Sequence, residues 1–253
     1  MKEEIQKSGK LSVVGTPIGN LKDITYRAVE TLISADIILC EDTRTTKKIL
    51  DRYEIHDKKL STWNEERSGV NVEKVVAWLE EGIHVALVSD AGTPGISDPG
   101  SKLVEKIRTH FLDVQYQVLN SGGEECGVII EAIPGPSALT SAISISGVAL
   151  NDFVFLGFLP HKKGRETLFK EIGSGERPYV FYESPHRILK TLESLQKFAP
   201  DKKVTICREL TKIHEEVVSG KASEILEFFD KNKEKMRGEF VVIVSLFSTP
   251  IHE

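Results

Sequence analysis

The chain has 253 residues, of which 40% are hydrophobic and 28% are charged, and its net charge is −5 at pH 7. This composition indicates a folded protein of one large domain or two medium ones and excludes a disordered chain, while no apolar run is long enough to span a membrane. The charge excludes a strongly basic nucleic-acid module, so a polyanion would have to be held by local clusters of cations. Residues 1–10 are charged, and we expect a flexible tail without a signal peptide.

Strand-like and helix-like segments alternate through the first part of the chain. In chain order, strands are expected at 11–15, 36–40, 58–62, 83–89 and 128–133, and helices at 23–35, 43–53, 70–82, 98–111 and within 134–147. Asp23 and Asp98 are placed to cap their helices, and Gly82 is placed to end one. Such alternation predicts a mostly parallel sheet with helices on its faces, in a first α/β domain over 11–148.

A second α/β domain is expected over 149–253. Its segments in chain order are a strand at 152–160, a strand, turn and helix at 177–198, a strand at 202–210, a strand end and helix at 217–231, and a strand at 238–247. Residues 109–128 contain the string SGGEECG, which favours a hairpin or a surface insertion.

Three cysteines, Cys40, Cys126 and Cys207, lie far apart in the sequence. An odd, sparse set without a C-x-x-C pair suits reduced thiols, so we expect a cytoplasmic protein. Cys40 and Cys207 follow apolar runs and are expected to be buried in strands. The histidines form no H-E-x-x-H pattern, so no metal site is expected.

Three loops rich in Gly, Pro and Ser each follow an expected strand. They are GTPIGN at 15–20, SDAGTPGISDPG at 89–100 and IPGPSALTSA at 133–142. The carboxyl ends of parallel strands share one edge of a sheet, where open α/β sheets bind ligands. Neither the dinucleotide-binding pattern G-x-G-x-x-G nor the P-loop pattern is present, and the loops carry no Lys or Arg for a phosphate. The loops therefore suit a ligand with a positive centre, the alternative being tight structural connections.

Several longer strings occur together in one order. They include VVGTPIGNLKDIT, CEDTR, VALVSDAGTPGISDPG, VFYESPHRI, CRELTKIHEE and GEFVVIV. Over about residues 11 to 245 the chain resembles the ribosomal RNA small subunit methyltransferase I family, within the tetrapyrrole-methylase-like class (class III) of S-adenosylmethionine (SAM)-dependent methyltransferases. The resemblance implies two α/β domains with SAM in a cleft between them, a homodimer, and methylation of the ribose 2′-hydroxyl of a cytidine in the decoding region of 16S rRNA.

The resemblance also implies which residues line the cofactor. By position in the matching strings these are Pro17, Ala91, Gly92, Thr93, Ile96, Ser137, Ala138, Tyr182 and Gly238. Two alternatives stay open, since Tyr182 could be a plain core aromatic and Ile96 could serve only to pack its loop.

Proton removal from the ribose hydroxyl would need a carboxylate, for which the candidates are Asp42, Glu183 and Glu41. A purely structural use of Asp42, as a helix cap or as a partner of Arg44, is the alternative. RNA phosphates would need local cations. The candidates are Arg44, Lys162, Lys163, Arg165, His186 and Arg187.

Two other functions remain open from the sequence. A small-molecule methyltransferase acting on a tetrapyrrole-like acid would need a deep basic pocket and no RNA. A non-catalytic ribosome-assembly factor would bind RNA without SAM, and the intact small-residue loops argue against it.

Overall fold

The computed structural model describes residues 9–63, 69–112 and 128–247, and these residues divide into two compact units. The first unit is Met1–Ser137 and the second is Ala138–Glu253. The division falls just before helix α5 (Ala138–Ile145), whereas the border predicted from the sequence comes after it. The domain borders themselves stay a prediction.

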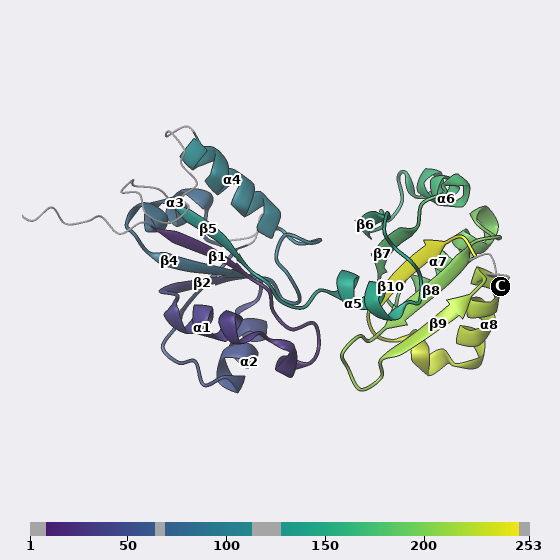
Figure 1. Ribbon diagram of the computed structural model, residues 1–253, viewed down its shortest axis with the longest axis horizontal. Coiled ribbons are helices and arrows are strands. Elements are labelled where there is room, and N and C mark those ends of the chain that lie inside the picture. The colour runs from purple at the N-terminus through teal and green to yellow at the C-terminus, as the bar shows by residue number, and fades with distance from the viewer. Residues whose placement is uncertain (1–8, 64–68, 113–127, 248–253) are drawn as a thin grey trace, which may run out of the picture. The chain divides into compact units, whose positions relative to one another are not determined.

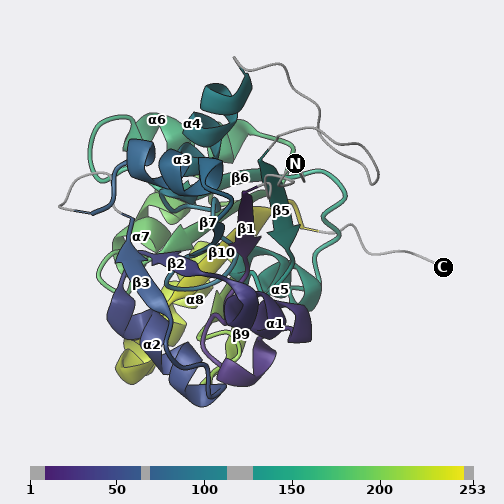
Figure 2. The ribbon, with the colours of Figure 1, turned by 90° about the vertical axis from the view of Figure 1, so that its left-hand side faces the viewer.

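The first unit contains a five-stranded parallel sheet in the order β3-β2-β4-β1-β5 (Figures 1 and 2). Its strands are β1 (Lys10–Val14), β2 (Ile37–Cys40), β3 (Lys59–Thr62), β4 (His84–Val88) and β5 (Ile129–Ile133). The central strands β2 and β4 are buried along their whole length, as expected for strands covered on both faces. All five strands run in the same direction, so their carboxyl ends share one edge.

Helices cover both faces of this sheet (Figure 2). They are η1 (Leu21–Asp23), α1 (Tyr26–Ser34), α2 (Thr43–Arg52), α3 (Val72–Glu80) and α4 (Gly100–Leu112). Alternate residues of each strand enter different cores: Leu87 packs in the α3 and α4 core, while Ala86 and Val88 pack in the α1 and α2 core. The period of two in the strand side chains therefore divides one sheet between two layers of helices.

The second unit has a mixed sheet in the order β6-β7-β10-β8-β9, in which β6 and β7 are parallel and the other neighbours are antiparallel. Its strands are β6 (Val154–Phe158), β7 (Tyr179–Glu183), β8 (Lys203–Arg208), β9 (Glu216–Gly220) and β10 (Phe240–Ser245). Its remaining helices are α6 (Arg165–Ser174), α7 (Ile188–Phe198), α8 (Ala222–Lys231) and η2 (Lys233–Met236). Helices α6, α7 and α8 share one apolar core with one face of the sheet.

The predicted strands are confirmed, with shifts of one or two residues at most ends. The predicted cap of the first helix is wrong, because Thr25 caps α1 by accepting from the Ala28 amide, while Asp23 ends the separate turn η1. Helix α6 has no counterpart among the predicted elements. Its apolar face is short, and the glycines and charged residues around it give no clear helical pattern.

The predicted insertion at 109–128 lies mostly outside the described residues; its first residues continue α4. Cys40 and Cys207 are buried strand residues, as predicted. In the described part of the chain, no helix is long and apolar enough to cross a membrane.

Candidate functional site

The candidate site is built from the loops that follow β1, β2, β4 and β5 at the carboxyl edge of the parallel sheet. Residues Gly15 and Thr16 directly follow β1, and they contact both of the other glycine-rich loops. The loops are therefore joined to one another as well as to their own strands.

The first and second loops form a short antiparallel bridge between Thr16 and Gly92. The Thr16 amide donates to the Gly92 carbonyl at 2.8 Å, and the Gly92 amide donates to the Thr16 carbonyl at 3.1 Å. The buried hydroxyls of Thr16 and Ser89 also donate to the Gly92 carbonyl, at 3.3 and 3.2 Å. Gly92 has φ +83°, a left-handed conformation that favours glycine, so this turn depends on that residue.

The third loop packs on both of the others. A Cβ added to Gly15 would lie 2.7 Å from the Gly135 Cα, so two backbones touch where both residues lack a side chain. The Thr93 hydroxyl donates to the Pro136 carbonyl at 3.2 Å, joining the second loop to the third. Three segments far apart in sequence thus form one continuous wall of backbone.

The predicted cofactor residues of the first unit all lie on this wall. Pro17, Gly92 and Ser137 are buried, Thr93 and Ile96 are half-buried, and Ala91 is exposed. Of the other predicted cofactor residues, Ala138 begins α5, Tyr182 lies in β7, and Gly238 precedes β10 with φ +99°. Cofactor binding by all of these residues stays a prediction.

The acids after β2 differ in their surroundings. Asp42 caps α2 by accepting from the Arg44 amide at 2.8 Å, and it also receives the Arg44 guanidinium at 2.6 to 3.1 Å. The hydrogen bonds from the Arg44 side chain and amide lower the pKa of Asp42 to about 2. Asp42 therefore both caps α2 and pairs with Arg44, which is the structural use considered for it in the sequence analysis. The ion pair engages the side chains of both residues.

Glu41 and Asp90 are adjacent acids at the same edge. The Asp90 amide donates to Glu41 Oε1 at 3.4 Å, and the Asp42 amide donates to Asp90 Oδ1 at 3.1 Å. Burial raises the pKa of Glu41, and the Asp90 carboxylate raises it further. Partial desolvation of the carboxylate likewise raises the pKa of Asp90, although the residue as a whole is exposed. Of Glu41 and Asp42, Glu41 is the stronger proton acceptor.

Glu183 lies in a buried cluster of the second unit. Its side chain has 0% exposure and accepts from the Thr191 hydroxyl at 2.6 Å and from the Ser184 amide at 2.8 Å. The guanidinium groups of Arg165 and Arg187 lie 3.5 and 3.3 Å from its two oxygens. This carboxylate is engaged as the centre of a structural network, and its catalytic role stays a prediction.

The predicted RNA-binding cations of the second unit fall into two groups, while Arg44 of the first unit is paired with Asp42. Arg165 and Arg187 are 15% and 16% exposed and belong to the Glu183 cluster. Lys162, Lys163 and His186 are exposed. The structure thus brings Arg165, His186 and Arg187 to one end of the second sheet, and only the exposed side chains are free to reach a phosphate there.

The loop wall fits a sulfonium cofactor better than a phosphate. Loops 15–20 and 89–99 contain no Lys or Arg. The carbonyls of Ser89, Gly92 and Pro136 accept hydrogen bonds from hydroxyls of the wall itself. Asp90 adds an exposed carboxylate. A carboxylate beside loops without Lys or Arg favours a positively charged ligand over a phosphate. Among the described residues, no group of three or more His, Cys, Asp or Glu could hold a metal ion.

Two contributors were missed by sequence reasoning, namely Gly15 and Thr16. The contact between Gly15 and Gly135 could not be predicted from the sequence, because the two glycines lie in different loops. Thr16 looks like an ordinary turn residue until its buried bridge to Gly92 is visible.

Comparisons with known proteins agree with this architecture. The family model described as Tetrapyrrole (Corrin/Porphyrin) Methylases matches residues 10–226. The solved structure of uroporphyrin-III-C-methyltransferase from Thermus thermophilus superimposes with a TM-score of 0.60 at 17% identity, covering 94% of each chain. That of the methyltransferase CobJ gives a TM-score of 0.64 at 20% identity, covering 97% of this chain and 98% of the other. The fold and the loop wall thus define a methyltransferase of the tetrapyrrole-methylase class.

Curated relatives narrow the class to one family. Ribosomal RNA small subunit methyltransferase I of Thermotoga maritima is 45% identical over 240 residues, which cover 94% of this chain and 98% of the relative. The protein of the same name from Hydrogenobaculum sp. is 40% identical over 245 residues, covering 96% and 99%. The chain belongs to the ribosomal RNA small subunit methyltransferase I family.

Proposed function

We propose that this protein is a SAM-dependent methyltransferase that modifies the ribose 2′-hydroxyl of a cytidine in the decoding region of 16S rRNA. The observation that carries the proposal is the wall of three joined loops, which presents close-packed backbone and the Asp90 carboxylate but no Lys or Arg. The names of the full-length relatives support the RNA substrate. The reduced, buried Cys40 and Cys207 are consistent with action in the cytoplasm, and the resemblance supports a homodimer.

Bound SAM would supply an electrophilic methyl group on a positively charged sulfur. The residues of the chain would place that group: Pro17, Gly92 and Thr93 shape the wall, and Asp90 adds negative charge beside it. Alignment of donor and acceptor can by itself supply on the order of 7–11 kcal/mol toward a displacement. The loop wall therefore acts mainly by orientation.

Glu41 is the acid that we propose to accept the ribose proton. Its raised pKa makes it a better proton acceptor than Asp42, whose carboxylate is held by Arg44. Replacing Glu41 by Gln should lower kcat while leaving SAM affinity unchanged. An unchanged kcat in Glu41→Gln would exclude Glu41 as the proton acceptor.

The central experiment measures SAM binding by calorimetry and then tritium transfer from labelled SAM to 30S subunits and to free 16S RNA. Gly92→Ala should lose SAM affinity, because its Cβ would lie 3.3 Å from Ile18 Cγ2 and its φ is strained. Gly147→Ala is the matched control, since Gly147 also has positive φ, +65°, with nothing within 4 Å of the added Cβ.

Label on either RNA substrate supports the proposed function. SAM binding without label on any RNA, together with label on a tetrapyrrole acid, would favour the small-molecule alternative. RNA binding without SAM binding would favour an assembly factor and contradict the proposal.

A further inference from the structure

Strand β6 carries an irregularity that changes which way one aromatic side chain points. Phe155 pairs with Val180 of β7, but the next paired residue is Phe158, opposite Tyr182, so three steps on β6 match two on β7. Gly157 within the bulge has φ +59°. Residues three apart in a regular strand face opposite sides, and a bulge re-aims one of them. Phe155 and Phe158 therefore lie on the same face as Tyr182.

These three rings form a small aromatic cluster. The Tyr182 ring meets Phe155 at 5.2 Å and Phe158 at 5.4 Å, both edge to face. Tyr179 and Phe181 point the other way, into the core beneath α6, α7 and α8. Phe158 is 57% exposed, so its ring is supported by Tyr182 on one side and is open to solvent elsewhere.

The backbone that follows Phe158 is held by the Glu183 cluster. Arg187 donates to the Leu159 carbonyl at 2.6 Å and to the Pro160 carbonyl at 3.3 Å, and Arg165 donates to the Pro160 carbonyl at 3.1 Å. Both guanidinium groups pair with the fully buried Glu183. The exposed ring thus stands on a fixed turn, and little conformational freedom would disappear when a ligand packs on it.

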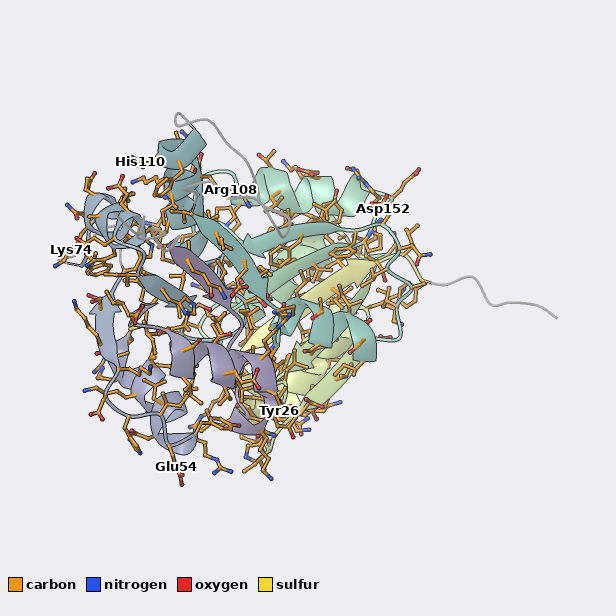
Figure 3. All side chains as sticks on the ribbon, turned by 60° about the vertical axis from the view of Figure 1, so that its left-hand side comes forward. Tyr26, Glu54, Lys74, Arg108, His110 and Asp152 are labelled. Atoms are coloured by element: carbon orange, nitrogen blue, oxygen red, sulfur yellow. The ribbon has the colours of Figure 1, made fainter. Side chains whose placement is uncertain are left out.

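Cations follow both this turn and the matching end of the parallel strand β7. His161, Lys162 and Lys163 follow it directly, and His186 lies in the turn after β7; all four are exposed, and their side chains have no hydrogen-bond or ion-pair partner among the described residues. Segment 160–164 contains no acid. Asp152, labelled in Figure 3, lies just before the opposite end of β6 and pairs with Arg177 at 3.7 Å. Positive charge is therefore concentrated at the end where Phe158 is exposed.

We propose that Phe158 is a base-stacking residue for a single-stranded segment of the RNA substrate, with Lys162 and Lys163 holding the neighbouring phosphates. The proposal rests on the proposed function for its ligand. Unstacked bases of RNA loops commonly pack on exposed aromatic rings, while cations beside them bind the backbone. An exposed ring followed by unpaired cations matches that chemistry. An uncharged protein partner would leave those cations without a counter-charge, so it suits this surface less well.

The test compares Phe158→Ala with Phe247→Ala in the full chain. Phe247 makes a matched control because it is 46% exposed and follows β10, a central strand of the same sheet, whereas Phe158 ends the edge strand β6. Binding to 30S subunits and to a short oligocytidylate would be measured at several salt concentrations, with SAM affinity and thermal melting alongside. Phe158→Ala should weaken RNA binding about 10-fold, which corresponds to ~1.4 kcal/mol, because one base loses the ring on which it stacks.

The salt dependence separates stacking from charge. Phe158→Ala should leave the slope of log K against log salt unchanged. Replacing both Lys162 and Lys163 by Ala should reduce that slope by about 0.7 for each phosphate that is no longer bound. Phe158→Trp should restore affinity and show quenched indole fluorescence on adding oligocytidylate.

Three outcomes would overturn the proposal. They are wild-type RNA affinity in a folded Phe158→Ala, a loss of SAM affinity instead, or dissociation of an oligomer measured by sedimentation, which would assign the ring to a second copy of the chain. Each of these outcomes can be interpreted only if the wild-type protein methylates RNA. If the wild type transfers no methyl group to RNA, the proposed function fails first.

Discussion

At the scale of single residues, the acids Glu41 and Asp42 differ in protonation behaviour because they contact different side chains. They are adjacent in sequence, yet Asp42 is tied to Arg44 while Glu41 shares its surroundings with Asp90. Their pKa values consequently move in opposite directions. A pair of acids whose environments separate their pKa values is a common basis for assigning catalytic and structural roles.

Asp42→Asn should reduce stability in a way that depends on pH. The pKa of Asp42 is lowered from 3.8 to about 2 in the folded protein, so its charge stabilises the fold above 3.8 and ceases to do so as the pH falls through about 2. Asn can still cap α2, which isolates the loss of the ion pair. Thermal melting of both proteins across this range should therefore converge as the pH falls.

Asp51→Asn is the control for that experiment, since Asp51 is an exposed acid on the same helix. It should melt like the wild type throughout. A difference between Asp42→Asn and wild type that persisted unchanged to the lowest pH would assign the effect to the cap rather than to the carboxylate charge.

At the scale of secondary-structure elements, the Glu183 cluster joins parts of β7, α6 and α7 and the turn after β6. Arg165 begins α6, Thr191 lies in α7, and Glu183 ends β7. A buried carboxylate that faces two guanidinium groups is costly to neutralise, because the remaining charges lose their partner. The cluster is therefore expected to stabilise this end of the second unit.

Glu183→Gln should lower the free energy of unfolding by ~3 kcal/mol, measured by urea denaturation. Glu166→Gln is the matched control: its pair with Lys170 on α6 is 63% and 61% exposed, and solvent screens such surface pairs, so its loss should change stability little. Because the cluster also holds the Leu159 and Pro160 carbonyls, KM for RNA should rise more than kcat falls. A folded Glu183→Gln with normal KM and abolished kcat would support a catalytic carboxylate instead.

At the scale of the whole molecule, each unit has its own buried core and its own buried thiol. Cys40 lies in β2 of the first unit, and Cys207 lies in β8 of the second, where its thiol donates to the Ala142 carbonyl at 3.7 Å. Burial raises the pKa of Cys207 to about 11 and also raises that of Cys40. Both thiols are therefore largely protonated and protected at neutral pH.

Iodoacetamide should label Cys40 and Cys207 slowly in the native protein and rapidly in urea, as read peptide by peptide by mass spectrometry. Labelling across a urea series would then report the opening of each unit separately, because each thiol becomes reactive only when its own sheet opens. Equal rates for native and fully unfolded protein at either cysteine would contradict the burial of that thiol.

The sequence alone determined the alternation of strands and helices, the three small-residue loops and the family, because periodicity, turn residues and long strings are local properties. It also placed the candidate acids at strand ends. Helix α6 and the cap Thr25 could not be predicted from the sequence, because short apolar faces and competing cap residues give ambiguous local signals.

Only the tertiary structure decided which residues act together. The Gly15 to Gly135 contact and the Thr16 to Gly92 bridge join segments remote in sequence. Arg165 and Arg187 proved to be half-buried partners of Glu183 rather than exposed cations. The bulge in β6 likewise exposes Phe158 through its register with β7. Pairing partners and burial depend on strand order and register, and those are fixed by the packing of the whole sheet.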